Sequence, residues 1–450
     1  MPLGRIVTIL GYPLQFASIC GTMVATKLAC TPNEVCDGKI AKGVTMTSCK
    51  VFSYPNNHIN SVTFHLVCHQ GAMTENKNEQ GITHLVEHLC FRKAGALNQS
   101  QLYHFAESKG VNIFGKTGKN YTELSFTCRP EVFDDIAKLV ANMWLELNYT
   151  TAELEIEKKV IFNEIALNEP TNGEIVLSKV WSNALLDCDI LGTKQTVHSI
   201  ALEQVINYKK FMLSSNTSII VAGNFSQDNL DVVQKEFVDK FVAVEEQPQA
   251  FVEQTNPDDK LVVVKDRYDY ADIYYSLHTT IGNSKENYVT ILALDDLLFR
   301  GNAGHVVEIL RDRLGYIYEI DSRVEIVNGE VGWLIRMSCH KNDVVQVVEC
   351  VETLLNNFVP SKDHLQYVKA FYCDNLPMLL DKPNIICDCA VNSIVAINQL
   401  VTLQEFANEC HKANTSLYKQ LLSQLLANKH VYVFGNVSRK TTKTLKNTIL

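Results

Sequence analysis

Apolar and polar positions along the chain follow two different periods, and their order predicts alternating strands and helices. Residues 62–68 (V-T-F-H-L-V-C) are rich in β-prone side chains, so we expect a buried strand there. Residues 81–92 carry apolar side chains at helical spacing and predict a buried helix. Two strands around glycines are expected within 111–126, and an amphipathic helix over 131–147. This mixture favours an α+β fold.

Two pairs of similar segments within the sequence indicate that the chain repeats one unit. S-I-I-V-A-G-N-F-S from Ser218 resembles H-V-Y-V-F-G-N-V-S from His430, and their glycines, Gly223 and Gly435, are 212 residues apart. E-H-L-C-F-R from Glu87 resembles D-D-L-L-F-R from Asp295, an offset of 208. Self-similarity at a nearly constant offset is the signature of duplication. We therefore expect two homologous α+β domains in tandem.

Composition between the two copies sets the expected domain boundaries. Residues 243–260 contain two prolines and many polar side chains, which is typical of a linker. The chain is then expected to consist of an N-terminal extension over 1–45, a first domain over 46–242 and a second domain over 261–450. The extension is mixed apolar, with Gly11 and Pro13 interrupting it, and is a poor signal peptide.

Bulk properties exclude some functions and favour one compartment. The 450 residues are 46% hydrophobic and 20% charged, with a formal net charge of −9, so no basic surface for nucleic acid is expected. The sequence has no run of 18 apolar residues, so no membrane-spanning helix is expected. Fourteen cysteines without a disulfide rhythm indicate a reducing compartment, and we expect a cytoplasmic protein. The close pair Cys387 and Cys389 permits a redox or metal site, but two buried thiols are favoured.

The first predicted helix carries the candidate chemistry. It contains His84, Glu87 and His88 as an H-x-x-E-H pattern. Residues four apart lie on one face of a helix, so both imidazoles can reach one Zn²⁺, with the carboxylate on the same side. The alternative is a half-exposed helix whose histidines find water or backbone partners. A third protein ligand would decide between the two, because catalytic zinc usually has three.

A candidate for that ligand lies 76 residues after His88. The stretch from Thr151, T-A-E-L-E-I-E-K-K-V-I-F-N-E-I-A-L-N-E, has helical composition and acidic residues in its first turns. Glu157 and Glu164 are seven residues apart and share a face of this helix. The alternative is an ordinary solvated acidic face.

Taken together, these motifs resemble the pitrilysin-type metallopeptidases, the family of insulin-degrading enzyme and mitochondrial processing peptidase. The resemblance extends to the run Gly71-Ala72-Met73-Thr74-Glu75 followed by Gly81, and to Leu191-Gly192-Thr193 followed by Ile200. It implies that Zn²⁺ is held by His84, His88 and Glu164, that Glu87 is the catalytic base and that Glu157 supports the site. It also implies two antiparallel-type sheets packed with helices, which form half of a clam-shell chamber.

A second element of the family pattern lies in the second copy. Residues 310–318 (L-R-D-R-L-G-Y-I-Y) resemble the family's L-R-x-x-x-G-x-x-Y, which implies that Arg311 and Tyr318 contact the bound peptide. The alternative is a surface arginine paired with Asp312 or Glu308 and a tyrosine packed in the core. In this copy Leu292, Asp295 and Asp296 replace the residues of the H-x-x-E-H pattern, so only the first half is expected to hold zinc.

The function that the resemblance implies is a zinc-dependent endopeptidase that binds an extended peptide against a strand. The usual Asn-Ala step of that strand is here Phe114-Gly115, a departure that leaves backbone pairing possible. The alternative is a non-catalytic peptide-binding or scaffold subunit of a related complex, and a weaker one is a small-molecule hydrolase. Single-chain relatives have four units and this chain has two, so a homodimer or a heterodimer with a related chain is expected.

Overall fold

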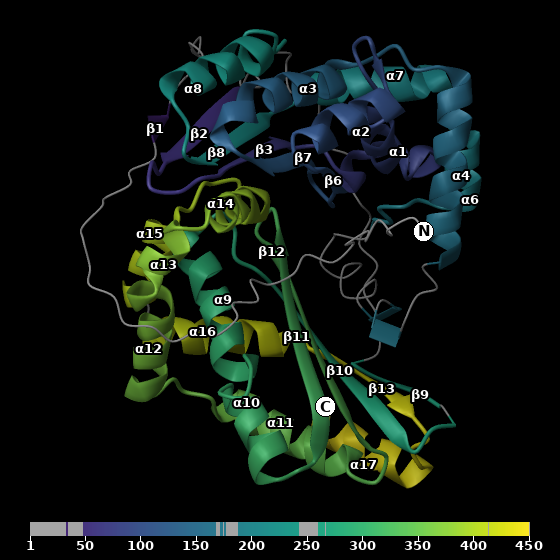
Figure 1. The fold of residues 1–450 in the computed structure, drawn as a ribbon. Helices are drawn as coiled ribbons and strands as arrows, with labels where there is room; N and C mark the ends of the chain where they lie inside the picture. Colours follow the sequence, from purple (N-terminus) through teal and green to yellow (C-terminus); the bar gives the residue numbers. More distant parts are fainter. Residues whose placement is uncertain are drawn as a thin grey trace, which may run out of the picture.

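The computed structural model describes residues 33–34, 48–167, 172–173, 175–176, 188–242, 260–265, 267–412 and 414–449. They form two halves, each with one main sheet and helices packed on it (Figure 1). In the expected N-terminal extension only strand β1 (Asn33–Glu34) is described, and it pairs with β2 (Cys49–Pro55). Most of the predicted linker lies outside the described residues.

The first sheet has the strand order β1-β2-β8-β3-β7-β6. Its strands beyond β2 are β3 (Val62–Cys68), β6 (Ile113–Thr117), β7 (Thr122–Cys128) and β8 (Thr217–Gly223). β2 and β8 are parallel, and the other pairs are antiparallel. The strand predicted at 62–68 is confirmed with the same limits, because its alternating side chains are buried on both faces of the sheet.

The second sheet repeats this topology. Its order is β11-β12-β10-β13-β9, built from β9 (Leu261–Val264), β10 (Tyr270–Thr280), β11 (Ile317–Val327), β12 (Glu330–His340) and β13 (His430–Gly435). Here too the pair at one end, β9 and β13, is parallel, and the rest are antiparallel. The expected duplication is therefore confirmed. Each sheet is antiparallel except for one parallel pair of strands, which makes it a mixed sheet.

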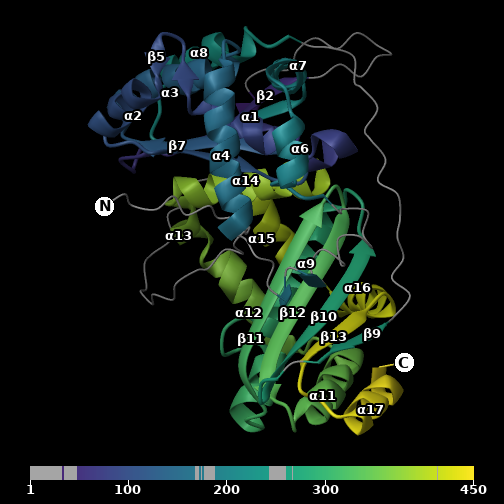
Figure 2. The same ribbon diagram turned by 90° about the vertical axis from the view of Figure 1, so that its right-hand side faces the viewer.

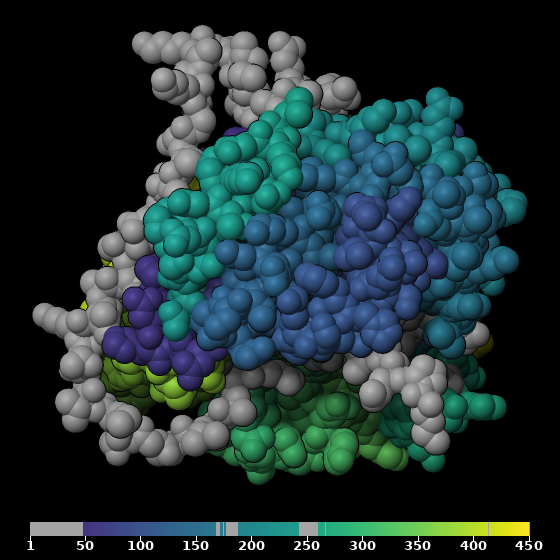
Figure 3. Space-filling view, turned by 45° about the horizontal axis from the view of Figure 1, so that its top comes forward, coloured from purple at the N-terminus to yellow at the C-terminus, as the bar shows by residue number. Residues whose placement is uncertain are grey.

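Helices cover the outer face of the first sheet. They are α1 (Ile82–Cys90), α2 (Gln99–Ser108), α3 (Phe133–Leu145), α4 (Thr151–Leu167), α6 (Lys194–Ser199), α7 (Leu202–Leu213) and α8 (Gln227–Val233). Figure 3 views this helical face, with the green second half visible beneath it. Helix α3 is shorter than the predicted 131–147, because residues Pro130–Val132 form a separate 3-10 turn before it.

The second half has a corresponding set of helices. They are α9 (Lys285–Phe299), α10 (His305–Val307), α11 (Val344–Asn357), α12 (Lys362–Lys369), α13 (Leu376–Leu380), α14 (Pro383–Ile397), α15 (Leu403–Lys412), α16 (Thr415–Ala427) and α17 (Arg439–Ile449). None of the helices in the described ranges is long and apolar enough to cross a membrane.

The two halves are joined by helices that cross from one to the other. Helix α14 of the second half packs on the first sheet, where Ile386 and Ala390 share a core with Ile220 (Figure 2). In return, Val176 of the first half packs on Tyr274 of the second sheet. The two halves are therefore joined by α14 on the first sheet and by Val176 on the second. The two cysteines of α14, Cys387 and Cys389, are buried free thiols, in agreement with the favoured interpretation.

Candidate metal centre

Helix α1 begins at a point that several distant residues fix. Gly81 has φ of 91° and lies so close to Leu191 that a Cβ would be 2.6 Å from its carbonyl oxygen, so glycine is required. The Glu75 carboxylate accepts hydrogen bonds from the backbone N–H groups of Gly81 and Thr83, both at 2.8 Å. It thereby caps the helix N-terminus, where unpaired N–H groups favour a carboxylate.

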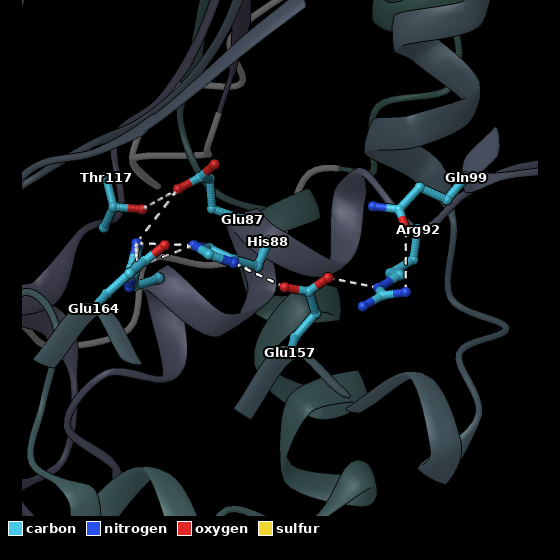
Figure 4. Close-up of polar contacts among 8 residues, drawn as sticks. Glu87, His88, Arg92, Gln99, Thr117, Glu157 and Glu164 are labelled. Carbon is cyan, nitrogen blue, oxygen red and sulfur yellow. Dashed lines mark hydrogen bonds and ion pairs between the residues drawn. The ribbon is translucent and has the colours of Figure 1, made fainter. Parts of the chain in front are cut away.

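Three side chains converge on one point beside this helix. Ligand atoms of His84, His88 and Glu164 all lie within 4.8 Å of one another. The Nε2 atoms of the two histidines are 3.2 Å apart, and Glu164 Oε2 is 3.7 and 3.6 Å from them (Figure 4). With bonds of about 2.0–2.1 Å, ligands of a tetrahedral Zn²⁺ are separated by about 3.3 Å. The three atoms therefore fit the corners of one zinc site.

Burial affects the two histidines alike, but the carboxylates around His88 give them different pKa shifts. Both imidazoles are buried, which lowers the pKa of His84 to about 3 and keeps its ring neutral, the form that binds metal. Burial also lowers the pKa of His88, but the hydrogen bond with Glu157 and the charges of Glu87 and Glu164 outweigh it, and the net shift is upward.

A second carboxylate orients His88 from behind. His88 Nδ1 donates to Glu157 Oε2 at 2.9 Å, which leaves Nε2 facing the metal position. Arg92 Nε donates to the other oxygen of Glu157 at 2.5 Å, and Arg92 Nη1 donates to Gln99 at 3.1 Å. Burial alone would raise the pKa of Glu157. The hydrogen bonds and charges of His88 and Arg92 outweigh burial, so the pKa is lowered and the carboxylate is charged.

This arrangement makes a prediction about Glu157. Glu157→Gln is expected to lower zinc affinity by about 10–100-fold, because the neutral amide holds the imidazole less firmly and makes it a weaker ligand. Competition with a chromophoric chelator measures the affinity. Glu155→Gln, on the exposed side of the same helix, is the matched control. Equal zinc affinity in both variants would show that Glu157 does not support the site.

The remaining residue of the motif, Glu87, stands beside the ligands without joining them. Its Oε2 is 3.9 Å from His84 Nε2 and accepts a hydrogen bond from Thr117 Oγ1 at 3.4 Å. A Cβ on Gly115 would lie 2.1 Å from Glu87 Oε1, so the absence of a side chain there gives the carboxylate its space.

Strand β6, which carries Gly115 and Thr117, is the last strand of its sheet. On its outer edge no further strand pairs with it in the described part of the chain. Phe114, on the same strand, is 61% exposed. An open edge next to a candidate metal centre can receive a peptide as an additional strand.

The structure places Arg311 and Tyr318 in the second half, and none of their described contacts is with His84, His88 or Glu164. Arg311, in the helical turn Glu308–Arg313, donates to Asn302 at 3.2 Å, and Glu308 pairs with Arg313 instead. Tyr318, at the start of β11, is 85% exposed. The alternative of a core-packed tyrosine is therefore wrong.

The counterpart of the motif in the second half has become a salt-bridged cluster. Asp296 pairs with Arg300 at 2.8 Å and accepts a hydrogen bond from Tyr372, while Ser322 donates to Asp295. Burial raises the pKa of Asp295 to about 7. Across the described residues, only His84, His88 and Glu164 form a group with metal-ligand spacing.

Sequence reasoning placed the three candidate ligands, Glu87 and Glu157 correctly on two helices, and the structure brings them together. It missed the contributions of Arg92 and Gln99. The only sequence signal for Arg92 was its place in the repeated E-H-L-C-F-R element. Glu75 was noted as part of the resemblance, but its capping role could not be read from the motif.

Comparison with known proteins agrees with this geometry. The family model described as Insulinase (Peptidase family M16) matches residues 50–194, and the model described as Peptidase M16 inactive domain matches residues 202–371. Both models describe parts of one family and together they span most of the chain. The chain therefore belongs to peptidase family M16, and the match to the model described as inactive runs from the end of its first half into its second.

Individual relatives are distant. A Rickettsia felis protein named as an uncharacterized zinc protease is 25% identical over 197 residues, 43% of this chain and 47% of its own length. A Bacillus subtilis protein of similar description is 27% identical over 187 residues, 40% and 46% of the two chains. The match thus spans about half the length of these curated relatives. A crystal structure of a Helicobacter pylori protease superposes with a TM-score of 0.75 at 15% identity, covering 90% of this chain and 99% of that one.

Proposed function

We propose that the protein is a zinc-dependent endopeptidase. The observation that carries the proposal is the convergence of His84, His88 and Glu164 on one tetrahedral position, with the Glu87 carboxylate beside it. Zinc at such a position lowers the pKa of a bound water and polarises a carbonyl. Incubation with a peptide panel, followed by mass spectrometry of new termini, tests the activity.

In this proposal Glu87 moves the proton. Its carboxylate is close to the ligands but takes no corner of the site, so it is placed to accept a proton from water on its way to the peptide carbonyl. The same carboxyl group then gives that proton to the leaving amine. Thr117 holds one oxygen of Glu87, and the recess at Gly115 holds the other.

The proposed substrate is an extended peptide. It would pair with the open edge of β6, with the backbone supplying hydrogen bonds and its side chains alternating between the two faces. Phe114 stands on this edge in place of the polar side chain of the family pattern. Which peptide is preferred, and whether the chain processes leader segments or degrades peptides, would follow from the panel.

The second candidate is a peptide-binding or scaffold subunit. The observation that favours it is the match of residues 202–371 to a domain described as inactive. The intact set of three ligands and Glu87 in the first half favours catalysis. Peptides that bind with zinc present but are never cut, either by this chain alone or with a related chain, would favour the subunit.

We further propose that two chains associate to complete the site. Arg311 and Tyr318 are exposed and make no described contact with the zinc cluster of their own chain. A two-fold dimer would bring each pair to the zinc site of the other chain.

The eleven cysteines that the structure describes are free thiols, which fits the proposed cytoplasmic location.

This arrangement predicts complementation if the protein is a homodimer. Glu87→Gln and Arg311→Ala are each expected to have low activity. Mixing equal amounts and allowing exchange should restore roughly a quarter of wild-type sites, because half the dimers are mixed and each contains one intact site. Peptide cleavage before and after mixing measures the recovery.

The control for this experiment is Arg313→Ala, whose side chain pairs with Glu308 on the same turn. Arg313→Ala should remain active by itself, so that the loss in Arg311→Ala is specific. If subunits exchange and nothing is restored, Arg311 does not act across a homodimer. A requirement for a different, related chain would instead show a heterodimer.

A further inference from the structure

A buried lysine and a buried cysteine meet behind the metal helix. Lys209 Nζ, on α7, lies 2.9 Å from Sγ of Cys90, the last residue of α1. Both side chains are fully buried. This pair has no part in the proposed peptidase chemistry, and the inference below is independent of that proposal.

The surroundings of the amine are unusual for a lysine. Its nitrogen is 4.0 Å from the centre of the Trp144 ring, and no ion pair with a carboxylate is recorded for it among the described residues. A buried ammonium normally requires a carboxylate partner, because removing its hydration is costly. The thiol sulfur of Cys90 is therefore the polar group that Lys209 contacts.

We infer that Cys90 and Lys209 form an oxidative modification site, at which peroxide joins the sulfur to the side-chain nitrogen in a reversible sulfenamide. Sulfenic acids condense with a backbone nitrogen to give a sulfenamide, and here the side-chain nitrogen of Lys209 stands at 2.9 Å from the sulfur as the nucleophile instead. The short distance between sulfur and nitrogen makes this partner available before any other thiol. The link would tie the end of α1 to α7.

The reaction balances with one molecule of hydrogen peroxide. The Cys90 sulfur attacks one peroxide oxygen, the O–O bond breaks, and the departing hydroxide takes the thiol proton to form water. Cysteine is thereby oxidised to sulfenic acid while peroxide is reduced. The Lys209 nitrogen then attacks the sulfur through its lone pair, the S–O bond breaks, and the sulfenic hydroxyl leaves with an amine proton as a second water.

A route for the oxidant exists on one side of the pair. Trp144, which contacts the Lys209 amine, also lines a surface pocket of about 500 Å³ together with Cys49 and the exposed Lys210. A hydrogen peroxide molecule that enters this pocket is separated from the Lys209 amine only by the Trp144 ring.

Other thiols in this region are less suited to react. Burial raises the pKa of Cys49, in the pocket wall, and of Cys68 to about 12, which keeps both protonated. Cys68 donates to the carbonyl oxygen of Met212 at 3.4 Å. Neither has a recorded amine contact comparable to that of Cys90.

Mass spectrometry of the full-length protein tests the inference. Reduced protein is treated with hydrogen peroxide, denatured in an alkylating reagent and digested without reductant. We expect a linked pair of peptides containing Cys90 and Lys209, with the mass of the two minus two hydrogens, that disappears on treatment with dithiothreitol. Oxidation should also shift the midpoint of thermal unfolding upward, because a link between positions far apart in sequence restricts the unfolded chain.

Variants separate this link from other oxidation products. Lys209→Met, which keeps an apolar chain of similar length, should lose both the linked pair and the shift in unfolding, whereas the matched control Cys68→Ser should keep both. Recovery of Cys90 only as free thiol or as sulfinic acid would overturn the inference. A disulfide between Cys90 and Cys68 in the wild-type protein would overturn it as well, and neither result depends on a variant that folds.

Discussion

Glu87→Gln is expected to leave zinc bound and to lower peptide turnover by about 10²–10⁴-fold, the usual contribution of a general base. The amide has the same shape as the carboxylate and can still accept the bond from Thr117, so the site should keep its geometry. It cannot take a proton from water. Turnover with a cleaved peptide and zinc content of the same sample measure the two parts of the prediction.

The control for this experiment is Glu107→Gln, an exposed glutamate on α2, which should retain both zinc and activity. The role assigned to Glu87 is wrong if its glutamine variant cleaves peptide at the wild-type rate. Loss of zinc in that variant would instead make Glu87 part of the metal-binding set.

His88→Ala is expected to have the other large effect, the loss of bound zinc. The variant removes one of three protein ligands and leaves the Glu157–Arg92 pair without the imidazole between it and the metal. Zinc content should fall from about one per chain to near zero, with complete loss of cleavage. Elemental analysis after dialysis against a weak chelator gives the stoichiometry.

His104→Ala serves as the matched control, because His104 is an exposed histidine of α2. Its zinc content should equal that of the wild-type protein. Full zinc occupancy in His88→Ala would mean that the metal is held by residues other than the three assigned here.

The parts of the site that lie within one helix could be predicted from sequence, because helical spacing alone fixes which side chains share a face. His84, Glu87 and His88 are such a set, and Glu157 with Glu164 is another. Helix α4 packs beside α1. This tertiary contact cannot be predicted from the local pattern of apolar and polar residues. The resemblance to a known family supplied that link before the structure did.

The duplication was also visible in sequence, because Gly223 and Gly435 end corresponding strands in the two copies. The packing of α14 on the sheet of the other half was not. Helix α14 contacts β11 of its own half as well as β3 and β8 of the first sheet, and this double packing depends on how the two sheets sit together.

Positions that depend on side chains from several elements were the hardest to predict. Gly115 is explained by the Glu87 carboxylate, and Glu75 by the N-terminus of α1, neither of which a linear pattern can show. The exposure of Tyr318 is a similar case. A tyrosine in a strand is usually half-buried, but β11 is an edge strand and this ring projects from it.

The most direct test of the account is a zinc titration of activity. Metal-free protein receives increasing zinc, and cleavage of a peptide from the panel is followed at each point, with any required partner chain present. The account predicts that cleavage rises with zinc and reaches its maximum at about one zinc per catalytic chain. Zinc bound at that stoichiometry without cleavage of any peptide in the panel would contradict it.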